Sequence, residues 1–335
     1  MFIIESYGVA VLLCVITMIC WGSWGNTQKL ASTKWRYELF YWDYTIGMLL
    51  FSVIMAFTLG SVGDSGRGFI ADLQQANNSN LAKALIGGVI FNASNILLSA
   101  SVSMAGMAVA FPLGVGLALV LGVFINYMKA PHGDPVMLFV GVAFIVIAII
   151  FNGFAASKKG GDASNAGKAK KGIILAAVAG VLMSFFYRFV AAAMDMENFE
   201  APTAGMITPY TAFVLFSAGV FASNFVFNTI LMKKPFDGEP VTYKEYFHGS
   251  ISTHMVGVFG GVVWALGTLF SYIAAGKAGA AISYALGQGA PMIAVIWGIF
   301  IWKEFKGAPK CVNILLLFMF LFFLSGLSLI VYSGM

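Results

Sequence analysis

Residues 85–116 read LIGGVIFNASNILLSASVSMAGMAVAFPLGVG, and residues 258–289 read VFGGVVWALGTLFSYIAAGKAGAAISYALGQG. The two stretches align without a gap at an offset of 173 positions, and nine of the 32 aligned residues are identical. Glycine and alanine raise such counts by chance. Composition alone, however, would not place a very short connection between two apolar runs at the same point of both stretches. A similarity at half the chain length indicates an internal repeat.

The composition identifies lipid as the solvent of this chain. Of its 335 residues, 60% are apolar or aromatic and only 10% are charged, and the mean hydropathy is +0.88. A soluble chain carries about 25% charged residues, so a soluble enzyme, a nucleic-acid-binding module and a secreted disulfide scaffold are excluded. The apolar runs are unbroken over about 20 residues, whereas strands of a membrane barrel alternate over about 10. The sequence therefore predicts an all-α membrane protein.

Ten apolar runs are long enough to cross a bilayer as helices. They are 8–28, 39–59, 82–102, 105–128, 135–155, 172–193, 207–231, 253–275, 279–301 and 311–332. The connections between them are short except for 60–81, 157–171 and 232–252, and none of these could fold as a domain. We therefore expect the functional site to lie between helices.

Positive charge is distributed unevenly over the connections. Fourteen of the nineteen Lys and Arg residues lie in the connections that follow the first, fifth, seventh and ninth runs. Short cytoplasmic loops carry the excess of basic residues, so both termini are predicted to lie outside. The net charge of +5 is interpreted as this topology signal rather than as a sign of a nucleic-acid partner. The predicted location is the cytoplasmic (inner) membrane of a bacterium.

A polar linker divides the chain into halves. Residues 157–172 read SKKGGDASNAGKAKKG, a composition typical of a flexible linker. We expect a first repeat over 1–156, a cytoplasmic linker over 157–171 and a second repeat over 172–335. Each half holds five predicted helices, and an odd number places the two halves in opposite orientations. Two inverted five-helix repeats are an architecture of secondary transporters, which work by alternating access.

The fourth and ninth runs carry helix-breaking residues at similar places. These are Pro112, Gly114 and Gly116 in the fourth run, and Gly287, Gly289 and Pro291 in the ninth. Proline removes a backbone donor and glycine loosens a helix, so both runs are predicted to be kinked or partly unwound near mid-membrane. Paired breaks point to a transport site, whereas a single glycine more often permits close helix packing.

Polar and aromatic residues inside the runs indicate the kind of solute. Asn92, Asn95 and Ser99 recur at helical spacing and form a polar stripe, which cannot face lipid. Amides and hydroxyls donate and accept hydrogen bonds, and aromatic faces cover flat or C–H-rich surfaces, so the set suits a small neutral solute. The alternative is polar contact between helices without a ligand. The predicted substrate-binding residues are Trp21, Ser23, Trp24, Asn26, Asn92, Asn95, Ser99, Phe111, Ser184, Tyr187, Arg188, Trp264, Thr268, Tyr272, Ser283, Tyr284 and Gln288.

Asp43 and Arg188 lie well inside the runs, where ionisable groups are functional candidates. Asp43 is the candidate for proton coupling, with capping of the second helix as the alternative. Arg188 is a candidate for solute binding, with the alternative that it reaches Asp195 or Glu197 at the interface. The cysteines and histidines lack metal-binding spacing, so no metal and no cofactor is expected.

Several short motifs resemble the plant ureide permeases. They are MFIIESYG at 1–8, WGSW at 21–24, DY at 43–44 and AFTLG at 56–60. The WGS element and WKE at 302–304 are also similar to bacterial glucose/ribose porters and, more distantly, to the rhamnose–proton symporter. The resemblance implies the drug/metabolite transporter (DMT) superfamily and its fold of ten helices in two inverted halves.

The linker distinguishes the ureide permeases from the bacterial sugar porters. Ureide permeases carry a long central loop with a Walker A motif, which cradles phosphate when it reads G-x-x-x-x-G-K-[ST]. Residues 161–168 have one residue too many, and Ala169 stands where the hydroxyl is needed. The short linker thus favours the bacterial sugar-porter branch and implies no ATP.

The sequence predicts a secondary transporter, not an enzyme, for a small neutral polar metabolite. A monosaccharide such as ribose, glucose or rhamnose is the preferred solute, driven by its own gradient or by protons. A ureide or nucleobase is the runner-up. An exporter of amino acids or drugs and a membrane receptor that does not transport are further alternatives. The paired helix breaks argue against a receptor, because a receptor does not need them.

Overall fold

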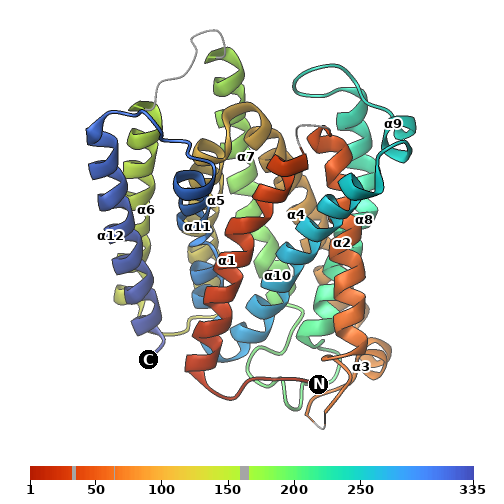
Figure 1. Ribbon diagram of the computed structural model, residues 1–335. Helices are drawn as coiled ribbons and strands as arrows, with labels where there is room; N and C mark the ends of the chain where they lie inside the picture. Colours follow the sequence, from red (N-terminus) through yellow and green to blue (C-terminus); the bar gives the residue numbers. More distant parts are fainter. Residues whose placement is uncertain (32–34, 64, 159–165) are drawn as a thin grey trace.

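The protein is a bundle of long helices (Figure 1). The computed structural model describes residues 1–31, 35–63, 65–158 and 166–335. Within these ranges, the one β-type pairing is an isolated bridge between Met194 and Ile207. The helices are α1 Tyr7–Ala31, α2 Tyr37–Phe57, α3 Phe69–Gln75, α4 Asn78–Ala105, α5 Met107–Tyr127, α6 Pro135–Lys158, α7 Ala166–Ala191, α8 Pro209–Lys233, α9 Tyr243–Phe247, α10 Ile251–Gly287, α11 Ala290–Ile296, the π-helix η2 Trp297–Ile301, and α12 Lys310–Ser333. The all-α membrane class predicted from the sequence is confirmed.

Nine helices of the described part of the chain are long and apolar enough to cross a membrane. The number is not the expected ten, because the runs 253–275 and 279–301 join into one helical segment, Ile251–Ile301, of 51 residues. Straight, that segment would measure about 75 Å at 1.5 Å per residue, more than twice the hydrocarbon thickness. Instead it bends at Gly279, whose φ of 75° and ψ of 158° are not helical.

Gly106 has nearly the same backbone conformation, with φ 81° and ψ 158°, and it separates α4 from α5. This region of φ and ψ is essentially restricted to glycine, because a side chain would clash with the backbone. Two pairs of consecutive runs are therefore joined through single glycines rather than through loops.

Two short helices lie in the longer connections and were not predicted. α3 belongs to the connection after α2, and α9 to the connection after α8. α9 begins with a capping box, in which Thr242 and Glu245 satisfy each other's backbone N–H groups. The expected linker is only partly visible, because 159–165 lie outside the described residues and α7 already begins at Ala166.

Helices from the two expected halves pack against each other. α1 packs on α10, α4 on α7, α2 on α10, α8 on α4 and α6 on α12. Glycines make some of these contacts close. A Cβ at Gly47 of α2 would overlap the carbonyl of Val258 in α10, and a Cβ at Gly219 of α8 would overlap that of Leu85 in α4. Small residues allow this approach between membrane helices.

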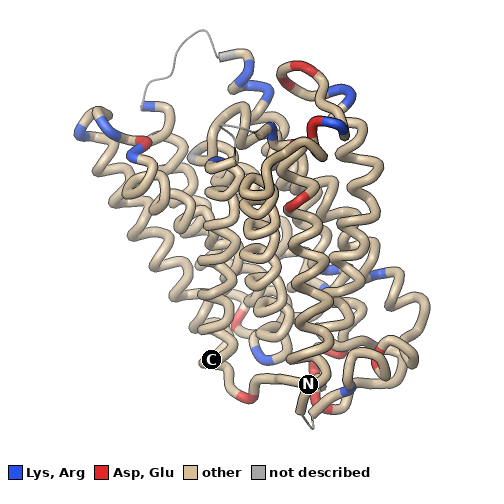
Figure 2. The backbone as a smooth tube through the Cα atoms, turned by 45° about the vertical axis from the view of Figure 1, so that its right-hand side comes forward, with Lys and Arg blue, Asp and Glu red and all other residues tan. Residues whose placement is uncertain are grey.

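Charge separates the two ends of the bundle. Both termini lie at one end, which we call the terminal end (Figure 1). Lys and Arg positions gather at the other, which we call the basic end (Figure 2). The clustering agrees with the loop charge count, and the side of the membrane that each end faces stays a prediction.

Candidate functional site

A small cavity lies in the middle of the bundle, between helices of both halves. Its volume is about 20 Å³. That space holds about one water molecule, so the helices are closed around it. It is lined by Trp21, Trp24, Phe91, Asn95, Leu98, Phe111, Val115, Met183, Phe186, Trp264, Gln288 and Ala290.

Aromatic rings form the walls of this central cavity. Trp21 of α1 and Trp264 of α10 stack with their centroids 5.8 Å apart and their planes at 11°. Phe91 of α4 packs on Trp264 at 4.3 Å, and Trp24 packs on Phe111 at 6.0 Å. Such faces favour a flat apolar or π-bearing surface.

The indole N–H of Trp21 is already used within the protein. It donates to the hydroxyl of Thr268 at 3.1 Å, and that hydroxyl donates to the carbonyl of Trp264 at 3.0 Å. Trp21 therefore offers its face, and not a hydrogen bond, to a molecule in the cavity.

Six predicted residues come together here, namely Trp21, Trp24, Asn95, Phe111, Trp264 and Gln288. The sequence analysis missed the other lining residues, most of which are apolar. Helical spacing could have found some of them, because Phe91 and Leu98 lie four and three residues from Asn95 on the same face of α4. Met183 and Phe186 sit on α7 and carried no polar signal.

Other predicted residues bind protein groups instead. Asn92 donates from Nδ2 to Ser223 at 2.9 Å, on α8. Tyr284 donates to the carbonyl of Ala118 at 3.1 Å. Ser184 donates to the carbonyl of Val181 at 2.6 Å. These residues tie helices or turns together and do not line the central cavity.

Two predicted residues near the end of α1 fix it to the η2 region. Ser23 accepts the indole N–H of Trp297 at 2.9 Å, and Asn26 accepts that of Trp302 at 2.6 Å. The carbonyl of Ser99 accepts the side-chain amide of Gln28 at 3.1 Å. These contacts tie the later turns of α1 to α4, to η2 and to Trp302.

A polar cluster connects α7 with both sides of the Gly279 bend. The hydroxyl of Tyr187 lies 3.0 Å from that of Ser271, which lies 3.1 Å from that of Ser283. Tyr272 is fully buried, and its hydroxyl has no hydrogen-bond partner in the described part of the protein. The cluster lies beside the central cavity, not in its lining.

The helix bounds differ between the two stretches for which breaks were predicted. α10 ends at Gly287, and α11 begins at Ala290 with Pro291 in its first turn, so the helix is interrupted beside Gln288. In the first half, Pro112, Gly114 and Gly116 all lie inside α5. The helix is continuous through these residues, and a kink within it stays a prediction. Gly114 and Gly116 instead meet Leu98 and Ile149 closely.

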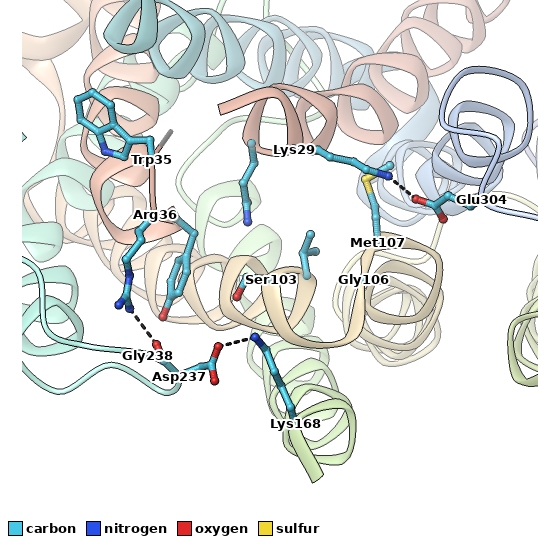
Figure 3. Close-up of a pocket in the computed structure, with 14 residues that line it drawn as sticks. Lys29, Trp35, Arg36, Ser103, Gly106, Met107, Lys168, Asp237, Gly238 and Glu304 are labelled. Carbon is cyan, nitrogen blue, oxygen red and sulfur yellow. Dashed lines mark hydrogen bonds and ion pairs between the residues drawn. The ribbon is translucent and has the colours of Figure 1, made fainter. Parts of the chain in front are cut away.

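A vestibule opens at the basic end, next to Gly106, with a volume of about 490 Å³ (Figure 3). Ion pairs cross it: Lys29 of α1 lies 2.6 Å from Glu304, and Lys168 of α7 lies 2.5 Å from Asp237. Arg36 donates to the carbonyl of Asp237 at 2.9 Å. The side chain of Glu38 accepts from Arg36 and raises the pKa of Arg36. The walls are thus charged but internally compensated.

A second vestibule, of about 820 Å³, opens at the terminal end next to Gly279. Arg188 lines it together with Lys129, His132 and Glu197. The expected pairing of Arg188 with Asp195 or Glu197 is not seen among the described residues, because the Asp195 carboxylate accepts the N–H and hydroxyl of Thr203. Arg188 lines this vestibule from α7.

Asp43 lies inside α2, so the helix-cap alternative does not apply. It is 3% exposed, and its carboxylate lies 2.9 Å from Nδ1 of His254 on α10. Tyr246 of α9 donates to it at 2.7 Å. Burial, together with this hydrogen bond, raises the pKa of Tyr246, so the phenol remains a donor. The sequence analysis considered the histidines only as metal ligands and missed this pairing. In the described ranges, no group of three metal-binding side chains occurs.

A closed cavity between two vestibules, inside a bundle of membrane-length helices, defines a multi-pass membrane protein of the kind that moves solutes. One solved protein structure shares this fold, with a TM-score of 0.61, 16% sequence identity and 97% coverage of each chain. The profile of the ureide permease family matches residues 40–172 and 165–333. The chain belongs to the ureide permease family and is a membrane transporter.

Comparison with individual relatives leads to the same family. Ureide permease 1 of Arabidopsis thaliana is 24% identical over 387 aligned positions, which cover 100% of this chain and 99% of the relative. Ureide permease 2 of the same plant is 22% identical over 396 positions, with the same coverage. These relatives favour the ureide alternative over the monosaccharide. The expected lean toward the bacterial sugar-porter branch receives no support from them.

Proposed function

We propose that this transporter moves a small, flat, neutral ureide or nucleobase through the central cavity by alternating access between the two vestibules. The observation that carries the proposal is the pairing of two side-chain amides, Asn95 and Gln288, with the stacked indoles of Trp21 and Trp264. A ureide offers N–H and C=O groups in one plane, which amides complement and indole faces cover. The names of the relatives support the same solute class.

The absence of charge from the cavity lining supports a neutral solute. Among the described residues, the lining contains amides, aromatic rings and aliphatic groups, and no ionisable side chain. The ionisable side chains lie beyond it, in the two vestibules. A charged solute would be costly to bury there without a partner. The cavity volume of about 20 Å³ is too small for a ureide, so we infer that the helices separate when the solute enters.

We also propose that ten crossings in two inverted repeats, 1–156 and 172–335, build this path. Two observations support it. Gly106 and Gly279 are matched positions of the two repeated stretches and share one backbone conformation. The helix pairs α1–α10 and α4–α7 would exchange under such a symmetry. The segment Ile251–Ile301 would then count as two crossings. With the basic end in the cytoplasm, both termini lie outside.

Coupling to protons is assigned in this proposal to Asp43 and His254. They join α2 to α10, which belong to different repeats, and together they can hold or release one proton. Asp43 is followed on α2 by Tyr44, whose ring packs 4.9 Å from Trp24 at the central cavity. The remaining predicted site residues, such as Tyr187, Ser283 and Arg188, would act along the path toward the terminal vestibule.

The test uses purified protein. Hydantoin, uracil, ribose and glucose are screened by thermal shift, because a ligand that binds the folded state raises its apparent stability. Solutes that bind are then measured for exchange across proteoliposomes. The proposal expects hydantoin or uracil to bind and exchange, and the sugars to do neither. Sugar exchange without ureide binding would restore the monosaccharide hypothesis, and binding without exchange would favour a receptor.

A further inference from the structure

The amide of Asn95 is held from behind the central cavity by two tyrosines. Its Nδ2 group donates to the hydroxyl of Tyr41 at 3.1 Å and to that of Tyr44 at 3.4 Å. Both tyrosines belong to α2 and are fully buried. Their rings stack on each other with centroids 5.3 Å apart. Neither tyrosine is part of the cavity lining, whereas Asn95 is.

This arrangement decides which end of the amide a solute meets. An asparagine amide has two N–H donors on one side and a carbonyl acceptor on the other. Because the tyrosine hydroxyls engage the donors, the group left for the cavity is Oδ1. Both bonds to the tyrosines are made by Nδ2, and neither engages Oδ1. Asn95 therefore meets a solute as an acceptor.

We propose that Tyr41 and Tyr44 are positioning residues that fix Asn95 as an acceptor, and that the site thereby selects solutes with an N–H group. The inference rests on the proposed ureide function and deepens it. In the occupied site, a solute that lacks this N–H leaves a buried carbonyl without a partner, and such an unpaired group costs binding energy. Trp21 cannot donate a hydrogen bond to this carbonyl in place of the solute, because its N–H already donates to Thr268.

The packing around the two tyrosines explains how the amide stays fixed. Tyr44 lies between Trp24 of α1, at 4.9 Å, and Phe40 of α2, at 6.2 Å. A Cβ at Gly261 of α10 would overlap the carbonyl of Tyr44, so α2 and α10 are in close contact at this point. The phenols thus have little freedom to turn away from Asn95.

The experiment compares hydantoin, a cyclic ureide with two N–H groups, with 1-methylhydantoin and 3-methylhydantoin, using binding to purified protein. In the wild type, one of the two methylated compounds is expected to bind at least about tenfold more weakly than hydantoin. We call this quotient of the two dissociation constants the methylation ratio. In Tyr41→Phe/Tyr44→Phe the amide can rotate, so the methylation ratio falls to about threefold or less. The bulk of the methyl group is the same in both proteins, so a change in the ratio reports the hydrogen bond.

Tyr210→Phe is the matched control. Tyr210 is also buried, but its hydroxyl donates to the carbonyl of Phe2 at the terminal end, 3.0 Å away. The methylation ratio of Tyr210→Phe is expected to equal that of the wild type. If the double variant does not fold, Tyr41→Phe and Tyr44→Phe are measured singly, and each is expected to lower the ratio.

Three outcomes overturn the inference. Equal binding of all three compounds to the wild type removes the acceptor role. A ratio that is unchanged in the tyrosine variants removes the positioning role. In both cases hydantoin still binds, so the proposed function stands. If hydantoin neither binds nor exchanges, the proposed function fails, and the inference fails with it.

Discussion

Gly106 and Gly279, which lie 173 positions apart, adopt φ and ψ values that agree within a few degrees, 81° and 158° against 75° and 158°. Each joins two long helices without a loop, and each borders one vestibule. A residue with a side chain rarely adopts this conformation. The two glycines therefore mark the points at which the polypeptide chain turns, one beside each vestibule.

Alanine at either glycine should destabilise the protein. A Cβ at Gly106 meets nothing within 4 Å, so Gly106→Ala reports backbone strain alone, about 1–3 kcal/mol. A Cβ at Gly279 would also lie 2.8 Å from His132, so Gly279→Ala should cost more. Thermal unfolding in detergent measures both.

The control for this series is Gly153→Ala. Gly153 lies within α6, also has open space around it and is helical, so alanine should be neutral or stabilising by up to about 1 kcal/mol. A loss in Gly106→Ala no greater than in Gly153→Ala would show that the unusual backbone at Gly106 is not needed.

The central cavity predicts different effects for two amides. Gln288→Ala should weaken hydantoin binding by about 1–3 kcal/mol if the solute is left with an unpaired buried group. Asn92→Ala should leave affinity unchanged, because Asn92 points to Ser223 of α8 and not into the cavity. Calorimetric titration of hydantoin into each variant measures the two affinities. Equal losses would mean that the open cavity includes Asn92.

The sequence predicted the membrane class and the polar members of the cavity because those signals are local. Apolar runs of about 20 residues require a span, and polar residues in a span require a partner. The way in which the first half turns was less predictable. Pro112 inside α5 is compatible with a helix, since neighbouring helices can satisfy the freed carbonyl, and the positive φ at Gly106 left no distinct trace in the sequence.

Contacts between distant segments were not predictable in this way. Asp43 and His254 are 211 residues apart, and neither hydropathy nor spacing connects them. The same holds for Asn95 and the two tyrosines of α2. One sequence without its fold gives the chemistry of a side chain, but not the direction in which that side chain is held.

Orientation can be tested by labelling single cysteines in intact cells. Cys311 is exposed, so the background is Cys311→Ser, and Cys14 and Cys20 are buried. Ser79→Cys at the terminal end should react with a membrane-impermeant reagent, whereas Lys244→Cys at the basic end should react only after the cells are opened. Both positions are exposed in the structure. The opposite pattern would reverse the orientation and leave the fold unchanged.

The last prediction concerns coupling, and the pair that carries it is Asp43 with His254. His254 Nδ1 lies 2.9 Å and 3.0 Å from the two carboxylate oxygens, and within the described ranges Tyr246 is the other titratable side chain hydrogen-bonded to Asp43. On α2, Glu38 is occupied by Arg36, and α8 presents the amides of Asn224 and Asn228, which do not titrate. Among the described residues, Asp43 and His254 therefore form an acid–base pair that can share a proton, with Tyr246 as a hydrogen-bonded neighbour.

Asp43→Asn and His254→Gln should each abolish accumulation of solute driven by an imposed pH gradient, because the pair can no longer exchange its proton. Exchange of labelled for unlabelled solute, which needs no net proton movement, should persist in both variants. Tyr246→Phe is the matched control, since it removes one hydrogen bond to Asp43 and leaves the proton site, and it should still accumulate solute. Proteoliposomes with an inward proton gradient measure all three. Accumulation by Asp43→Asn equal to that of the wild type would make the pair a structural tie between α2 and α10 and would favour transport down the solute gradient alone.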